Sequence, residues 1–90
     1  MPTAFVLIRT KKDDAGAVEY ILQALRKRDA VKEAYRFLES QTYVPMGYTV
    51  MAMVRVDTIK ELKSFLNFEL KFIVANRVES NPEALIWSPS

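Results

Sequence analysis

The chain has 90 residues, half of them hydrophobic, so it can form one domain around one core. It contains neither cysteine nor histidine, which excludes disulfides, zinc–thiolate centres and catalysis by histidine. Thirteen basic and eleven acidic residues leave a net charge of +2, which is unlike the strongly basic surface of a protein that binds nucleic-acid phosphates.

The first half of the chain predicts a strand, a helix and a second strand. Residues 3–10 (TAFVLIRT) are rich in β-formers and apolar on both faces of a strand. Asp13 or Asp14 then caps a helix that runs to about Arg28. The apolar stripe of this helix consists of Ala15, Val18, Ile21, Leu22 and Leu25. Residues 31–40 (VKEAYRFLES) alternate apolar and charged side chains, which suits a strand at the edge of a sheet.

The second half predicts a connection, a third strand and a second helix. Pro45 and Gly47 are turn formers before the strand at residues 48–56 (YTVMAMVRV). Thr58, with Glu61 three residues later, forms a capping box that opens the helix. The residues that this helix is expected to bury are Ile59, Leu62, Phe65 and Leu66, with Ile73 added if the helix continues that far.

The end of that helix leaves two options open. Residues 70–74 (LKFIV) could close the helix or begin a strand, and Asn76 could be a left-handed cap just beyond it. Residues 77–87 (RVESNPEALIW) predict the last strand, which Pro82 confines to an edge or splits in two. Packing in the core or at an interface is expected of Tyr20, Phe65, Phe68 and Phe72.

The element order βαββαβ predicts an α+β domain with the ferredoxin-like fold and an antiparallel sheet in the order 4-1-3-2. Because each β-α-β crossover is right-handed, both helices must cover the same face of the sheet. The strands at residues 3–10 and 48–56 then lie in the centre, and they are the two whose sequences are apolar on both faces.

The second face of these central strands needs a cover that two helices cannot supply. It carries Phe5, Leu7, Met51 and Met53, or their neighbours if the register is reversed. An exposed apolar patch of this size is unusual on a soluble monomer. We therefore expect a homodimer packed sheet to sheet, a dimeric α/β barrel, with these four residues at its interface. The alternative is a monomer whose own tail half covers the methionines.

Several pieces of the sequence resemble a known domain. The segments AFVLIRT, VKEAY and VMAMVRVDTIKELKSFL, followed by a final strand, resemble the RAM domain (regulation of amino-acid metabolism). This is the C-terminal effector domain of Lrp/AsnC-type transcription regulators, and small stand-alone versions of it exist. The resemblance covers residues 3–87, so residues 1–90 are expected to be a single RAM-like domain without a helix-turn-helix domain.

The resemblance implies a ferredoxin-like subunit, sheet-to-sheet dimers and often rings of dimers. It also implies a small effector, usually an amino acid, that binds where subunits or dimers meet. Without a helix-turn-helix domain, the chain is expected not to bind DNA directly. It would instead modulate a full-length Lrp/AsnC-type regulator by forming mixed oligomers. No cofactor is expected.

In this family the effector site includes a Gly-x-Tyr-Asp-like motif between the second and third strands. Gly47 and Tyr48 are its nearest match, while no residue from 41 to 54 is acidic. Tyr35 and Tyr43 lie around the same hairpin. Ligand contacts are therefore expected from Tyr35, Tyr43, Gly47 and Tyr48, with plain packing as the alternative. No catalytic or metal-binding residues are expected.

Three other interpretations stay open. An RNA recognition motif shares the βαββαβ order, although Met51 and Met53 stand where its base-stacking aromatic residues belong. A small dimeric α+β-barrel enzyme could place Glu33, Glu39 and Arg55 inside its barrel. An ACT domain also senses amino acids with this element order.

The expected location is the cytoplasm. No apolar run approaches the roughly 20 residues that span a membrane, and the N-terminus MPTAFVLIRT has no signal-peptide pattern. The lack of cysteine and the low content of asparagine and glutamine would suit a thermophile.

Overall fold

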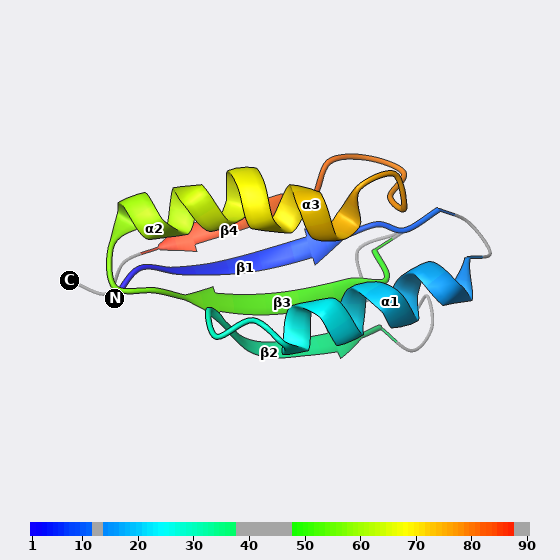
Figure 1. Cartoon of the computed structure of the whole chain (residues 1–90), viewed down its shortest axis with the longest axis horizontal. Coiled ribbons are helices and arrows are strands. Elements are labelled where there is room, and N and C mark those ends of the chain that lie inside the picture. Colours follow the sequence, from blue (N-terminus) through cyan, green and yellow to red (C-terminus); the bar gives the residue numbers. More distant parts are fainter. Residues whose placement is uncertain (12–13, 38–47, 88–90) are drawn as a thin grey trace.

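Four antiparallel strands form one sheet, and helices cover one of its faces (Figure 1). The computed structural model describes residues 1–11, 14–37 and 48–87. The elements in chain order are β1 (Thr3–Ile8), α1 (Ala15–Arg26), β2 (Val31–Arg36), β3 (Val50–Arg55), α2 (Ile59–Ser64), the π-helical turn η1 (Phe65–Glu69), α3 (Leu70–Val74) and β4 (Glu83–Trp87). The sheet order β2-β3-β1-β4 is the 4-1-3-2 order of the ferredoxin-like α+β fold, which confirms the predicted topology.

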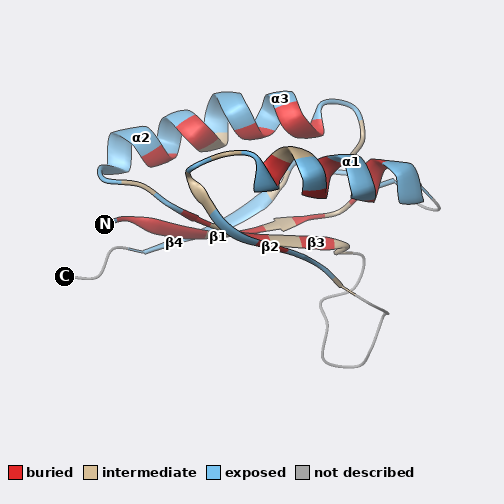
Figure 2. Ribbon diagram, turned by 60° about the horizontal axis from the view of Figure 1, so that its bottom comes forward, coloured by how far each residue is buried: buried red, intermediate tan, exposed pale blue. Residues whose placement is uncertain are grey.

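The core lies between the helices and one face of the two central strands. Six residues of that face are fully buried: Ala4, Val6, Ile8, Val50, Ala52 and Val54. Because side chains alternate along a strand, the residues between them project from the opposite face. The buried sides of the helices all point toward the sheet (Figure 2). The register is therefore the expected one and not its reverse.

Asp14, one of the two residues proposed as a cap, begins α1. Its Oδ1 accepts a hydrogen bond from the Ala17 N–H at 2.9 Å. The helix ends at Arg26 rather than at Arg28. The Arg26 guanidinium donates a hydrogen bond to the Ala34 carbonyl oxygen at 2.9 Å, which ties the end of α1 to β2.

The second helix runs without a break through α2, η1 and α3, so residues 70–74 close a helix and do not begin a strand. Thr58 opens this helix as predicted, because its hydroxyl oxygen accepts a hydrogen bond from the Glu61 N–H at 3.1 Å. The same first turn leaves Ile59 47% exposed, which corrects the expectation that Ile59 is buried.

A π-turn in the middle of this helix changes which residues face the sheet. The Leu70 N–H bonds to the Phe65 carbonyl oxygen five residues earlier, and both residues are buried. Phe68 and Phe72 are 71% and 75% exposed, so neither packs in the core of the subunit, and the interface packing expected as the alternative stays a prediction.

The chain after the second helix differs from the prediction in two details. The residue with positive φ is Ala75, at φ 45°, and not Asn76. The predicted strand at residues 77–87 is split, because Val78 forms an isolated bridge to the segment after β1. β4 begins after Pro82 and lies at the edge of the sheet.

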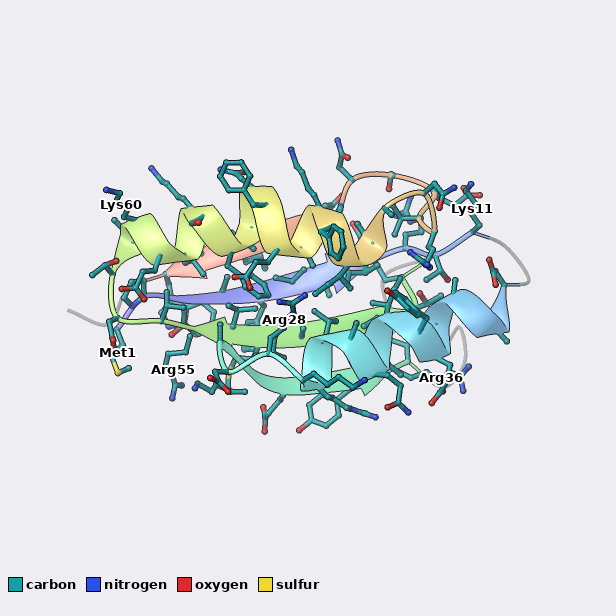
Figure 3. All side chains as sticks on the ribbon, in the orientation of Figure 1. Met1, Lys11, Arg28, Arg36, Arg55 and Lys60 are labelled. Carbon is teal, nitrogen blue, oxygen red and sulfur yellow. The ribbon has the colours of Figure 1, made fainter. Side chains whose placement is uncertain are left out.

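Polar contacts join the helices on the surface. Arg28 lies between α1 and the second helix, with its Nη1 3.3 Å from the Glu69 Oε1 (Figure 3). The Arg77 guanidinium lies 3.9 Å from the ring centroid of Tyr20, which is 45% exposed and packs at the surface instead of in the core. None of the helices that the structure describes is long and apolar enough to cross a membrane.

Candidate interface and ligand site on the open sheet face

The sheet face opposite the helices, which we call the open face, carries three rows of side chains. Directly paired residues of antiparallel strands project from the same face. The first row is Tyr35, Met51, Leu7 and Glu83, and the second is Glu33, Met53, Phe5 and Leu85. The third row contains Arg55, Thr3 and Trp87.

The centre of the open face is apolar and contains the four residues expected at an interface. All four are half-buried: Phe5, Leu7, Met51 and Met53. Leu85 and Trp87 extend this patch onto β4, where they are 66% and 40% exposed. The Trp87 ring lies against Phe5 with 4.7 Å between the ring centroids, so β4 shields part of the patch.

Sequence reasoning missed the contribution of β4 to this face. A strand that begins after Pro82 alternates Glu83, Leu85 and Trp87 on one side. Because β4 pairs with central β1, this side lies next to Phe5. The alternation of side chains along residues 83–87, directly after Pro82, was the sequence signal that could have predicted this contribution of β4.

A polar cluster of Arg9, Tyr48 and Glu83, which we call the Tyr48 corner, lies at one end of the first row. The side-chain hydrogen bond between Tyr48 and Glu83 is the main cause that raises the pKa of Tyr48, with partial burial and the Glu83 charge as lesser causes. The Arg9 guanidinium lies 4.7 Å from the Tyr48 ring centroid and acts on the pKa in the opposite direction. The Tyr48 hydroxyl beside the Glu83 carboxylate therefore keeps its proton to a higher pH than a free tyrosine does.

Backbone and hydroxyl contacts hold Tyr48 in this position. The Thr49 N–H donates to the Ile8 carbonyl oxygen at 2.9 Å, and the Thr49 and Thr10 hydroxyl oxygens lie 3.0 Å apart. These contacts fasten the residues before β3 to the end of β1, which brings the Tyr48 ring beside Arg9.

Tyr35 lies on β2, near the other edge of the open face. A side-chain hydrogen bond with Glu33 is the main cause that raises the pKa of Tyr35, and the Arg26 charge acts against it. Tyr35, Glu33 and Arg26 line a hollow of ≈ 280 Å³ together with Lys32. This hollow is open to solvent and places two cations beside one carboxylate.

The expected ligand residues do not gather in one place within a subunit. Three strand spacings, roughly 14 Å, separate Tyr35 from Glu83 in the first row. Tyr48 contacts Glu83 and is thus far from Tyr35. Tyr43 and Gly47 lie outside the described residues.

Charges on the open face are balanced. Glu33 and Glu83 lie among its rows, with Arg55 in the third row and Arg9 at the Tyr48 corner. Figure 3 shows Arg55 at the sheet end that lies near Met1. Within the described ranges, no group of three or more Asp or Glu side chains could hold a metal ion.

The chain is similar to known proteins in structure but not in sequence. No sequence-family model matches the chain, and no curated protein matches it in sequence. Hypothetical protein PHS023 from Pyrococcus horikoshii is similar with a TM-score of 0.76 and 22% identity, over 100% of this chain and 93% of its own. AsnC from E. coli has a TM-score of 0.70 and 24% identity, over 99% of this chain and 52% of AsnC.

A third similar structure is the transcriptional regulator NMB0573 from Neisseria meningitidis, in complex with L-Met. Its TM-score is 0.69 at 12% identity, over 98% of this chain and 50% of the regulator. The chain thus spans about half the length of either regulator. At these identities the comparisons establish the fold: the chain has a RAM-like, ferredoxin-like fold, as its sequence resemblance to the Lrp/AsnC effector domain implied.

Proposed function

We propose that this chain is an effector-binding and oligomerisation module of the Lrp/AsnC type, whose subunits pair through their open faces. The observation that carries the proposal is the composition of the open face, an apolar centre with charged and hydroxyl groups at its corners. Protein interfaces have this anatomy, with a core of apolar side chains and a polar rim.

Burial of the apolar centre can outweigh the cost of association. Fully burying a large apolar side chain contributes roughly 1.5–3 kcal/mol, so side chains that are already half-buried contribute about 1 kcal/mol each. The six that would be buried are Phe5, Leu7, Met51, Met53, Leu85 and Trp87. Counted in both copies they give about 12 kcal/mol, against an association cost of about 4–15 kcal/mol. A homodimer is therefore the smallest assembly that we expect.

The Tyr48 corner is the site that we propose for the effector. Glu83 provides a carboxylate for an α-ammonium group, and the neighbouring Arg9 guanidinium suits an α-carboxylate. Glu83 would take the part of the acidic residue that the family carries in the hairpin and this chain lacks. An amino acid or a similar zwitterion is thus the ligand class, in agreement with the L-Met complex of the Neisseria regulator.

The proposed role is binding and not catalysis. Subunits would exchange through the open face with those of a full-length Lrp/AsnC-type regulator and so change its assembly. The balanced charge of the open face favours a protein partner over RNA, since RNA binding needs an excess of basic residues near the backbone phosphates.

Native mass spectrometry of the purified chain, titrated with single amino acids, tests this proposal. Even-numbered assemblies that retain a ligand are expected. Glu83→Gln keeps the shape of the side chain but removes its charge, so ligand affinity should fall about tenfold while the dimer persists. Glu19→Gln on the exposed face of α1 is the matched control and should change neither. A chain that stays monomeric and retains no amino acid would refute the proposal.

A further inference from the structure

The two edges of the sheet differ in how well they are protected from another strand. β2 carries the charged residues Lys32, Glu33 and Arg36, and it has a β-bulge between Val31 and Glu33. Charges and bulges at an edge discourage further strand pairing. The β2 edge is therefore protected.

The opposite edge, β4, lacks this protection. Its sequence EALIW has one charge at its first residue, and it pairs with β1 without a register shift. All five residues are exposed (Figure 2), and β1 is the strand that β4 pairs with among the described residues. The backbone N–H and C=O groups on its outer side are thus available to a further strand.

We infer that the β4 edge pairs with β4 of a second copy of this chain, antiparallel and centred on Leu85. A two-fold axis at Leu85 places Ala84 of one strand opposite Ile86 of the other, and Glu83 opposite Trp87. The small Ala84 side chain leaves room for Ile86 on the helix side of the sheet. The two Leu85 side chains meet on the open face, and no like charges become direct neighbours.

A second copy fits this edge for two reasons. The sequence of β4 is complementary to itself in this register, whereas the charges and the bulge of β2 disfavour a β4–β2 contact between subunits. The edge is also continuous with the open face, because Leu85 and Trp87 belong to both.

Edge pairing goes beyond the proposed function and can fail independently of it. Open-face pairing depends on side chains, whereas edge pairing depends on the backbone of β4. Two different two-fold contacts on each subunit convert dimers into closed rings or other even-numbered assemblies. The β4 edge thus provides the contact between dimers.

Ile86 is the position at which a substitution tests this edge. It is 46% exposed and projects on the helix side, away from the open face. Ile86→Lys places a charge at the edge in both copies, and we expect the dissociation constant of the edge contact to rise about tenfold or more. Ile59→Lys is the matched control, because Ile59 is 47% exposed at the start of α2 and should leave the assembly unchanged.

Analytical ultracentrifugation over a concentration series gives the result. Wild-type protein should assemble beyond the dimer, and Ile86→Lys should stop at the open-face dimer. Met53→Glu, which disrupts the open face, should keep a dimer joined through β4, and the double variant should be monomeric. Wild-type protein that never exceeds a dimer, with Met53→Glu monomeric at every concentration, would overturn edge pairing and leave the proposed function intact.

Hydrogen exchange of the wild-type protein provides a measurement that needs no variant. Alternate amide groups of an edge strand point outward and exchange rapidly unless another strand covers them. The outward amides of β4 should be protected at high protein concentration and lose this protection on dilution, while those bonded to β1 stay protected. Outward amides whose exchange does not depend on concentration would overturn the inference.

Discussion

Met53→Glu is the sharpest probe of open-face pairing. Met53 lies in the second row between Glu33 and Phe5, so the substitution places a carboxylate in the apolar centre. Each copy loses the burial that a half-buried methionine gains on pairing, about 1 kcal/mol, and must desolvate a carboxylate at a cost of at least about 1.5 kcal/mol more. Over two copies the dimer is weakened by about 5 kcal/mol, which is about a 4,000-fold increase in its dissociation constant.

Size-exclusion chromatography with light scattering measures this change, with circular dichroism to check the fold. Met53→Glu should show no assembly that depends on the open face. Its mass should not exceed that of a dimer joined through β4. Phe68→Glu is the control, because Phe68 is 71% exposed on the helix side and should leave the assembly unchanged. In the Ile86→Lys background, where edge pairing is removed, a Met53→Glu protein that retains the mass of Ile86→Lys alone would show that the open face is not an interface.

Three further predictions concern stability and titration. Phe65→Ala should lower the free energy of unfolding in urea by about 3–5 kcal/mol, because Phe65 is 1% exposed; Phe68→Ala should change it by less than about 0.5 kcal/mol. Ala75→Gly should raise it by about 1 kcal/mol, since glycine accepts φ 45° without strain; a lower urea midpoint would contradict this. Because the bond to Glu83 raises the pKa of Tyr48 above 10.0, the folded state keeps a proton that the unfolded state loses, so this contribution to stability is present below pH 10.0 and is lost as pH rises above it. Ultraviolet titration of Glu83→Gln should move the Tyr48 pKa back toward 10.0, and an unmoved titration would count against the bond.

The topology could be predicted because local and long-range signals agree. The sequence marks the helix starts with a cap at Asp13 or Asp14 and another at Thr58, and the caps observed are Asp14 and Thr58. The two strands that are apolar on both faces are the central strands β1 and β3. Because β-α-β crossovers are right-handed, both helices cover the same face of the sheet. Element order and apolar pattern together therefore determine the strand order.

The apolar pattern of the second helix predicted the buried residues Leu62, Phe65 and Ile73, but it missed Leu70 and wrongly included Ile59. Phe65 and Leu70 are five residues apart, a spacing that an α-helix does not place on one face, yet both are buried because η1 is a π-turn. The inserted residue changes the rotation of the turns that follow, and Phe68 and Phe72 face water. Nothing in the spacing of apolar residues marks such an insertion in advance.

The candidate site was predictable only where it depends on alternation within one strand. Phe5 and Met53 follow from the two-residue period of their own strands, and the structure places them on the open face. The Tyr48 corner depends instead on the pairing of Leu7 with Glu83, which are far apart in the sequence. The hairpin lacks the acidic residue of the family motif. Glu83 can be identified as its replacement only once the β1–β4 register is known.

The position of the Tyr48 corner makes ligand binding and assembly interdependent in the proposed role. Glu83 is paired with Leu7, so a ligand on Glu83 lies at the rim of the surface that open-face pairing would bury. A ligand that contacts both copies binds the dimer more tightly than the monomer, and it must stabilise the dimer by the same factor. Glu83 is also the first residue of β4, whose outer edge we assign to the contact between dimers. A ligand that displaces β4 would therefore change both the open-face contact and the edge contact between dimers. The core between α1 and β3 would stay unchanged.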